Sequence, residues 1–374
     1  MTNSDGNRTE DSDKSTFPYI DISEIIDEFS SPAQEATRQI YPLLLLPQPK
    51  IAFHASDADG IICAAILKSC GVDEFKSANS IYIPLNYQQI KHPRFGRYLA
   101  RVHWIAVVDL PPIQDLNDGV LLFCDHHLTN KEVPKVAKEV LFDEEAPSAA
   151  KLLADHFQEA LPSHIKTLAA LTTITDTASY IIEPPVDVSD EVPTDLSSQA
   201  WLIHDICESV KSPLEIIKLV DDLVERGLTN ALLLEYRGNV RKVREKRVET
   251  LHMVEEINLA DVVLIVLGKR KISTTTLVQS LFSKGVKLTC FFYPGKVFTG
   301  LSFRVNSQLP QSEVESLRVD RITQQFSGGG HPRAAGGRST SFSQALKKVK
   351  SWVTQKGMSY ELYDLRDEGN NLDQ

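Results

Sequence analysis

Aspartate and histidine side chains recur at points where short apolar runs of this sequence end. Eight of them stand out: His54, Asp57, Asp59, Asp109, Asp125, His126, His127 and Asp176. The first three follow the apolar run 50–54, Asp109 follows 104–108, and the Asp-His-His triplet follows 120–124. Asp176 stands in Thr-Asp-Thr, after a helical pattern. Side chains of these types can bind metal ions or transfer protons.

The chemistry that suits so many carboxylates is metal binding. Acidic groups packed within a few ångströms repel one another, and divalent cations remove that penalty. Carboxylates with a few imidazoles suit manganese, magnesium or iron better than a thiolate-preferring metal. A carboxylate that bridges two ions about 3.5–4 Å apart is typical of phosphoryl-transfer sites. Any one of these aspartates could instead cap a helix or a turn, but several clusters at strand ends favour a shared site.

The elements that must position these residues alternate between strands and helices. Strands are predicted at 50–54, 81–85, 104–108 and 120–124, and helices at 61–70, 148–157 and 165–175. This alternation predicts an α/β fold with a mainly parallel sheet flanked by helices. Because ligands gather outside the carboxyl ends of parallel strands, we expect the clusters to converge at one edge.

A second α/β unit is predicted after a loop at 183–196 and a long helical region at 213–259. The charge run 241–247 within that region is interpreted as a solvated helix face. We predict strands at 262–267, 286–292 and 297–305, and helices at 274–283, 314–325 and 341–353. The predicted division is a disordered tail, a catalytic domain, a helical linker, a smaller substrate-binding domain and an acidic tail, at 1–18, 19–210, 211–259, 260–360 and 361–374.

A glycine-rich segment, Ser-Gly-Gly-Gly-His-Pro-Arg, is the second candidate for chemistry. The amides of Gly328, Gly329 and Gly330 could approach an anion closely, as in a phosphate nest. His331 and Arg333 add charge-assisted donors. Ala334 and Ala335 are expected to begin a packed helix.

Together these ordered motifs resemble the DHH phosphoesterase superfamily, from about Lys50 to Ser179 and again near the C-terminus. The resemblance implies that His54 and Asp57 hold one metal ion, and that Asp59 and His126 hold a second. It makes Asp109 and Asp176 further ligands, with Asp109 as the bridge. His127 would contact the substrate phosphate, and Asp125 would orient a histidine. Two divalent cations, manganese or magnesium, are the implied cofactors.

The spacing of His54 departs from the family pattern. It precedes Asp57 by three positions, where pyrophosphatase-like and nanoRNase-like members commonly have four and RecJ-like members two. The glycine-histidine segment resembles the signature of the DHH-associated substrate-binding domain. In that domain an arginine on a neighbouring strand also contacts substrate, and Arg304 matches its place. The expected cleft lies between the two domains.

The resemblance leaves the substrate open. The glycine-histidine domain argues against an inorganic pyrophosphatase. Hydrolysis of short oligonucleotides or small nucleotides, as by nanoRNase or 3′-phosphoadenosine 5′-phosphate phosphatase, or of a dinucleotide, is favoured. A RecJ-like single-strand exonuclease is the alternative, although those enzymes usually carry an additional oligonucleotide-binding fold. A non-catalytic scaffold or replication partner is disfavoured, because such relatives lose metal ligands.

Composition is consistent with a cytoplasmic protein. A net charge of −10 argues against broad coating of duplex nucleic acid. Five scattered cysteines without a paired motif suggest reduced core thiols, not a disulfide framework or a zinc site. No apolar run is long enough to span a membrane. The expected partners are a nucleotide, a short oligonucleotide or single-stranded nucleic acid, and a homodimer is left open.

Overall fold

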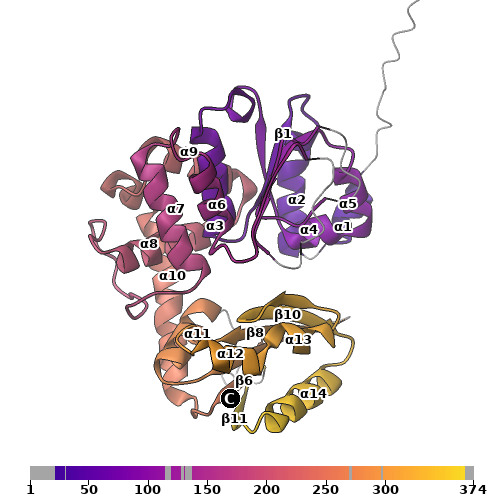
Figure 1. Ribbon diagram of the computed structural model, residues 1–374, viewed down its shortest axis with the longest axis vertical. Helices are drawn as coiled ribbons and strands as arrows, with labels where there is room; N and C mark the ends of the chain where they lie inside the picture. Colours follow the sequence, from indigo (N-terminus) through magenta and orange to yellow (C-terminus); the bar gives the residue numbers. More distant parts are fainter. Residues whose placement is uncertain are drawn as a thin grey trace, which may run out of the picture.

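Two lobes, each built around its own sheet, make up the computed structural model (Figure 1). The structure describes residues 22–29, 31–113, 119–127, 130, 137–268, 272–295 and 298–366. The tail predicted at 1–18 lies outside the described residues, as does the part of the C-terminal tail beyond 366. No helix within these ranges is long and apolar enough to cross a bilayer.

The first sheet is entirely parallel, which confirms the predicted α/β class. Its strands run in the order β2-β1-β3-β4-β5. Their bounds are β1 Lys50–His54, β2 Ile81–Leu85, β3 Trp104–Val108, β4 Leu122–Asp125 and β5 Glu139–Phe142. The first three coincide with the predicted strands, and β4 begins two residues later than predicted.

Helices cover both faces of this sheet (Figure 1). One face carries α3 Ala58–Ser69, α6 Ala149–His156, α7 Ser163–Asp176, α8 Leu196–Ser209 and α9 Pro213–Arg226. The other carries α1 Ser23–Asp27, α2 Ser31–Leu44, α4 Tyr87–Lys91 and α5 Pro93–Leu99, and a 3-10 turn, η1 Asp73–Phe75, precedes β2. Alternation along β1 explains the two layers: Ile51 and Phe53 enter one core and Ala52 the other.

Helix α10, Asn230–Glu256, joins the two lobes. At 27 residues it is about 40 Å long. Its first turns, with Leu232 and Leu233, pack in the core of the first lobe, whereas Met253 and Val254 pack in a core of the second. The predicted helical region 213–259 is therefore two helices, because the backbone of Gly227 at φ 60° ends α9.

The charge run on α10 corrects the sequence interpretation. Arg244 and Arg247 are buried, and both pair with the buried Asp205 of α8. The predicted solvated face is wrong for these two residues, whereas Arg241 is exposed as expected. Helical periodicity alone could not reveal the error, since the acidic partner lies on another helix.

The second sheet is mixed, in the order β11-β6-β7-β8-β10-β9. Its strands are β6 Val262–Val266, β7 Leu288–Pro294, β8 Thr299–Val305, β9 Gly329–His331, β10 Ala334–Ser339 and β11 Tyr360–Asp364. Strands β11, β6 and β7 are parallel, and β7, β8, β10 and β9 are antiparallel. Its helices are α11 Thr274–Ser283, α12 Gln311–Leu317, α13 Val319–Gln324 and α14 Phe342–Gln355.

Three local predictions in this lobe need correction. Ala334 and Ala335 begin strand β10, not a helix, because the following glycines favour the extended pairing with β8. The helix predicted at 314–325 is split at Arg318, which is left-handed at φ 42°. Residues 361–364 form most of the edge strand β11 instead of an acidic tail, since their backbone pairs with β6. All five cysteines are buried and form no disulfide.

Candidate metal centre

The candidate site lies where the chain reverses direction across the first sheet. From β1 the chain passes to β2 on one side and then to β3 on the other. The carboxyl ends of β1 and β3 therefore flank a crevice of the kind in which α/β folds bind ligands. His54 ends β1 and Asp109 follows β3, so the site predicted from strand ends falls at this switch point.

Three overlapping groups of three potential ligands lie here. His54, Asp57 and Asp109 form the first, Asp59, His126 and Asp176 the second, and Asp109, His126 and His127 the third; ligand atoms within each group lie within 4.8 Å of one another. His54 Nδ1 is 3.1 Å from Asp57 Oδ2, so three-residue spacing brings the two together at the start of α3. Glycine at position 60 permits this approach, because the Cβ of any other residue would clash with the His54 carbonyl oxygen at 2.1 Å.

Asp109 belongs to both the first and the third group. Its Oδ2 is 3.3 Å from His54 Nδ1 and its Oδ1 is 3.6 Å from His127 Nδ1. The side chain is buried, and its backbone is left-handed at φ 53°, a conformation that costs energy for a residue with a side chain. Neither carboxylate oxygen makes a hydrogen bond within the described residues.

The second group is oriented by the backbone at the start of α6. The Nδ1 of His126 lies 3.1 Å from the Ala146 carbonyl, so it donates there and leaves the Nε2 lone pair facing the carboxylates. That Nε2 is 3.4 Å from Asp176 Oδ2 and 3.6 Å from Asp59 Oδ2. The Asp59 carboxylate in turn accepts the amides of Ala149 and Ala150, each at 2.8 Å.

Asp125 orients His126 and His127 through hydrogen bonds. It is fully buried, and its Oδ1 accepts the amides of His126 and His127 and the Nδ1–H of His127 at 2.9 Å. Its Oδ2 accepts from Asn130 at 2.6 Å. The predicted orienting role of Asp125 thus has a geometric basis at His127.

The electrostatics of the cluster favour a positive counter-charge. Burial, together with the neighbouring carboxylates, raises the pKa of Asp59 and Asp109, and it raises the pKa of Asp176 to about 8. Burial alone would also raise the pKa of Asp57, but the charge of His54 outweighs it and lowers that pKa to about 2. Repelling carboxylates of this kind are stabilised by divalent cations.

Buried polar atoms without hydrogen-bond partners in the cluster also favour a bound cation. His54 Nδ1, His126 Nε2 and both Asp109 oxygens are buried without a hydrogen-bond partner in the described part of the chain. Buried polar atoms are normally paired, so their convergence calls for a missing partner. Oxygen and imidazole ligands in this number fit manganese or magnesium.

Tyr87 is a neighbour of the site that the sequence analysis missed. Its ring centroid lies 4.8 Å from that of His54 and 6.4 Å from that of His127. It begins α4, directly after the carboxyl end of β2, with Asn86 as the helix cap. Its place after the predicted strand 81–85 was a usable signal, but a tyrosine at a strand end is less specific for metal chemistry than an aspartate or a histidine.

The second lobe places Arg304 toward the cluster. Burial lowers the pKa of Arg304, and the charges of Tyr293 and Asp176 oppose that shift, so this guanidinium lies within electrostatic reach of the first lobe. Gln279 Nε2 also donates to the Ala178 carbonyl at 3.3 Å, close to the end of α7. Arg304 is thus a predicted substrate-binding residue whose charge reaches Asp176 of the candidate site.

The glycine-histidine segment forms the β9–β10 hairpin. Its glycines are needed for the hairpin itself: a Cβ on Gly328 would lie 2.0 Å from the Gly336 carbonyl oxygen, and one on Gly330 would lie 2.5 Å from that of Ala334. The backbone of His331 pairs with Ala334, beside Arg304. Arg333 donates to the carbonyls of Asn306, Ser307 and Leu309, so its guanidinium supports the chain after β8, and its contact with substrate stays a prediction.

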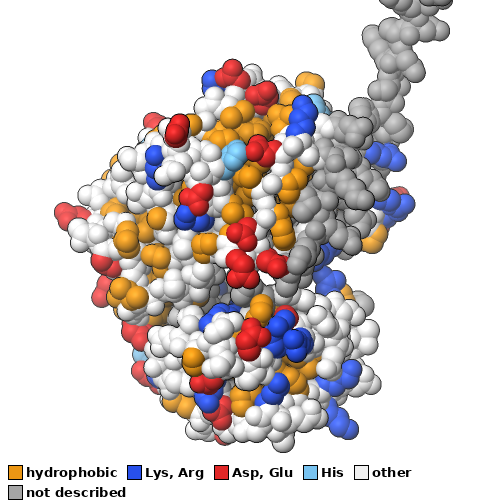
Figure 2. Space-filling model, in the orientation of Figure 1, with side chains coloured by type: hydrophobic (Ala, Val, Ile, Leu, Met, Phe, Trp, Pro, Cys, Tyr) orange, Lys and Arg blue, Asp and Glu red, His pale blue; other side chains and the backbone are white. Residues whose placement is uncertain are grey.

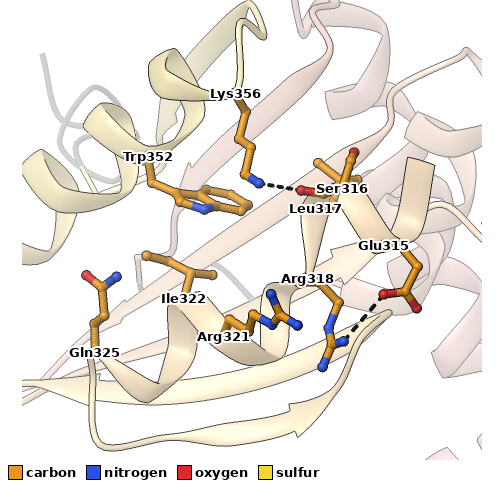
Figure 3. A pocket seen from close by; sticks show the side chains of 9 residues that line it. All are labelled: Glu315, Ser316, Leu317, Arg318, Arg321, Ile322, Gln325, Trp352 and Lys356. Carbon is orange, nitrogen blue, oxygen red and sulfur yellow. Dashed lines mark hydrogen bonds and ion pairs between the residues drawn. The ribbon is translucent and has the colours of Figure 1, made fainter. Parts of the chain in front are cut away.

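A separate depression in the second lobe lies between α12, α13 and α14 (Figure 3). Arg318 there bonds Glu315 and Asp320, and Lys356 bonds the Ser316 carbonyl. These charges are therefore engaged within the lobe. None of the predicted site residues lines the depression.

Comparisons with known proteins show the fold. No protein-family model matches the sequence, and no curated protein matches it. Solved structures do match, among them the pGpG-specific phosphodiesterase PggH from Vibrio cholerae and RecJ from Thermus thermophilus in complex with Mn²⁺.

The PggH match has 16% identity and a TM-score of 0.55, and covers 83% of this chain and 99% of that one. The RecJ match has 16% identity and a TM-score of 0.52, and covers 89% of this chain but 55% of RecJ. The chain therefore spans about half of that RecJ and nearly all of PggH. These matches confirm, at the level of the fold alone, the resemblance that the sequence motifs indicated.

Proposed function

We propose that this protein is a metal-dependent DHH-type phosphoesterase that hydrolyses short oligonucleotides or small nucleotides. The observation that carries the proposal is the placement of Asp109, a buried carboxylate in strained backbone whose two oxygens face His54 and His127. Strain of this kind persists where function requires it. A shared carboxylate between two groups of ligands is the arrangement that a pair of cations needs.

In this proposal His54, Asp57 and Asp109 hold one cation. Asp59, His126 and Asp176 hold the other, with Asp109 shared between them. The bound ions, manganese or magnesium, would supply an acidic water and neutralise phosphate charge. The Mn²⁺ complex of the RecJ neighbour supports this choice of metal.

The remaining residues bind and orient the phosphate. Burial would lower the pKa of His127, but its hydrogen bond to Asp125 raises it to about 9. The ring would therefore carry a positive charge at neutral pH, and its second nitrogen would donate to a phosphate oxygen. Arg304 would contribute a second cation from the opposite lobe. Gly328, Gly329, Gly330 and His331 would add donors from the hairpin beside it.

A small substrate is favoured over a long strand. The PggH neighbour, whose description names pGpG, is covered almost completely by this chain, whereas RecJ is covered for about half its length. The shared fold thus corresponds to the whole of a dinucleotide-hydrolysing protein. A RecJ-like exonuclease stays the alternative, and a non-catalytic scaffold is disfavoured by the complete set of ligand types.

The test compares three substrates with Mn²⁺-supplemented protein: a 5′-phosphorylated dinucleotide, 3′-phosphoadenosine 5′-phosphate and a long single strand. We expect hydrolysis of one of the small substrates, and we expect Asp109→Asn to lower kcat at least about a hundredfold. Mn²⁺ at about a hundred times its Kd should also stabilise the wild type by about 2.7 kcal/mol. Asp109→Asn should lose most of that stabilisation.

Asp155→Asn is the matched control, because Asp155 is an exposed aspartate on α6 that pairs with Lys151 of the same helix. It should retain wild-type activity and the full metal-induced shift. Undiminished activity of Asp109→Asn would contradict the metal site. Degradation of the long strand alone would favour the exonuclease, and a folded protein inert toward all three substrates would favour the scaffold.

A further inference from the structure

One face of the second sheet carries two rows of side chains that the mechanism does not fully use. Strand register places Thr289, Arg304 and Ala334 in one row across β7, β8 and β10. A second row, four residues away from Arg304 along β8, comprises Tyr293, Gly300 and Arg338. The rows are about 13 Å apart at the usual rise per strand residue. The first contains the proposed phosphate ligand, so the second lies further along the same face.

The outer row is an exposed aromatic surface with a cation. Tyr293 and Phe298 are 43% and 44% exposed, respectively. The Tyr293 ring rests against Gly300, where a Cβ would be 3.5 Å from that of Tyr293. The Arg338 guanidinium carbon lies 5.0 Å from the Phe298 ring centroid. Exposed rings beside an arginine are the usual platform for nucleobases.

The opposite wall is helix α4 of the first lobe, which lies across from β10 (Figure 1). Its first residue, Tyr87, contacts the rings of His54 and His127. Its last residue, Lys91, has its Nζ 5.3 Å from the Tyr87 ring centroid. The Lys91 ammonium therefore lies beside Tyr87, at the margin of the candidate metal centre.

Lys91 ends α4 and Arg338 lies on β10, so the two cations belong to elements that face each other across the lobes. Burial lowers the pKa of Lys91, and the positive charge of Arg338 lowers it further. Within the residues that the structure describes, neither cation has an ion-pair partner. Two like charges from different lobes repel unless an anion lies between them. Lys and Arg side chains also line the right-hand end of the notch between the lobes in Figure 2.

We propose that Lys91, Arg338, Tyr293 and Phe298 form a subsite for the nucleotide next to the reacting phosphate. The two cations bind a phosphate of that nucleotide, and the two rings stack on its base. This subsite rests on the proposed phosphoesterase function and specifies its substrate as at least a dinucleotide. It also requires the two lobes to approach each other, since neither wall alone provides both cations.

The test measures binding, so that it does not depend on turnover. The full chain in EDTA is titrated with a fluorescently labelled 5′-phosphorylated diguanylate. We expect Lys91→Gln and Arg338→Gln each to raise Kd about tenfold or more, since each removes a charge-assisted contact. Tyr293→Ala should raise Kd by a similar factor through lost stacking, and Tyr293→Phe should not.

Lys350→Gln is the matched control. Lys350 also lies over a tyrosine ring, with its Nζ 5.4 Å from the centroid of Tyr360, but it belongs to α14, which packs on the opposite face of the sheet. It should leave Kd within about twofold. Unchanged Kd in Lys91→Gln and Arg338→Gln, or an equal rise in Lys350→Gln, overturns the subsite.

A second measurement separates this inference from the proposed function. Hydrolysis of bis(p-nitrophenyl) phosphate, a single phosphodiester without a nucleotide, reports on the metal cluster alone. Wild-type protein and Lys350→Gln should cleave it at the same rate with Mn²⁺. Cleavage by a wild type whose Kd for the labelled diguanylate does not change in Lys91→Gln and Arg338→Gln would overturn the subsite alone, whereas a wild type that binds the diguanylate but is inert toward every phosphodiester would refute the proposed function.

Discussion

At the scale of single residues, the charge of His127 depends on one buried neighbour. Asp125 is inaccessible to solvent and directs Oδ1 at the His127 ring. A carboxylate in that position stabilises the imidazolium and fixes which nitrogen faces outward. The folded-state pKa of His127, about 9, therefore lies above the ordinary value. The ring keeps its proton below that pH and loses it as the pH rises through 9.

We predict that Asp125→Asn makes the His127 ring lose its proton at lower pH. The amide keeps most of the shape of Asp125 but removes the negative charge that raises the His127 pKa. The basic limb of the kcat/KM profile should shift to lower pH, with activity at pH 8 reduced about 10–100-fold. The measurement is a pH–rate profile of wild type, Asp125→Asn and His127→Gln. A variant whose activity fell equally at every pH would show that Asp125 only supports the fold.

Residue types at strand ends were enough to predict that these side chains converge, and Asp125 as a support, but not the backbone groups that orient them. The aspartates and histidines after β1, β3 and β4 converge because parallel strands end at one edge. The groups that orient them are backbone atoms of Ala146, Ala149 and Ala150, far along the chain. Backbone contacts leave no residue-type signal. For the same reason, the three hydrogen bonds of Arg333 to carbonyls after β8 could not be predicted from a cation beside a glycine motif.

At the scale of elements, helix α10 is held to the first lobe by a buried ion triad. Asp205 accepts from Arg244 Nε at 2.8 Å and also pairs with Arg247, whose guanidinium stacks 4.8 Å from the Trp201 ring centroid. Arg247 Nε also lies 3.3 Å from Thr276 Oγ1 on α11. One side chain thus links α8, α10 and α11, which belong to both lobes.

Removing the Arg247 side chain should lower the free energy of unfolding substantially. Arg247→Ala leaves the Asp205 carboxylate buried with only one arginine, and breaking a buried pair in this way costs about 3–5 kcal/mol. We expect a fall of that size in the free energy of unfolding, measured by urea denaturation. Arg241→Ala, three positions before Arg244 on the exposed face, should change it by less than about 0.5 kcal/mol. Equal effects of the two variants would contradict the buried triad.

At the scale of the whole molecule, the two lobes share one continuous element. The sequence indicated two α/β units correctly, because each repeats the strand–helix alternation. It could not show that α10 completes the second core, since Met253 and Val254 read as part of a connector. Nor did it show β11, which pairs with β6 and packs Tyr360, Leu362 and Tyr363 against the two cores of the second lobe. In both cases the deciding contact is distant in sequence.

The boundaries of the second lobe can be tested with two fragments. One spans 260–360, the division predicted from the sequence, and the other spans 248–366. The shorter fragment lacks Met253, Val254, Ile257 and Leu365, all buried in the core beside α11. Each such side chain contributes about 1.5–3 kcal/mol, so their combined loss rivals the whole stability of a domain, about 5–15 kcal/mol.

We therefore expect 248–366 to melt cooperatively and to give a dispersed amide NMR spectrum, whereas 260–360 should do neither. Its residual helix content in circular dichroism would come from α11 and α14, without the packing that fixes them. Adding only residues 248–259 to the shorter fragment should recover part of the stability, because these residues restore three of the four missing side chains. If 260–360 melted cooperatively at the temperature of the longer fragment, α10 would be a spacer between two independent domains. The metal cluster and Arg304 would then owe their alignment to the cleft contacts alone, and the Arg247 triad would stabilise only the first lobe.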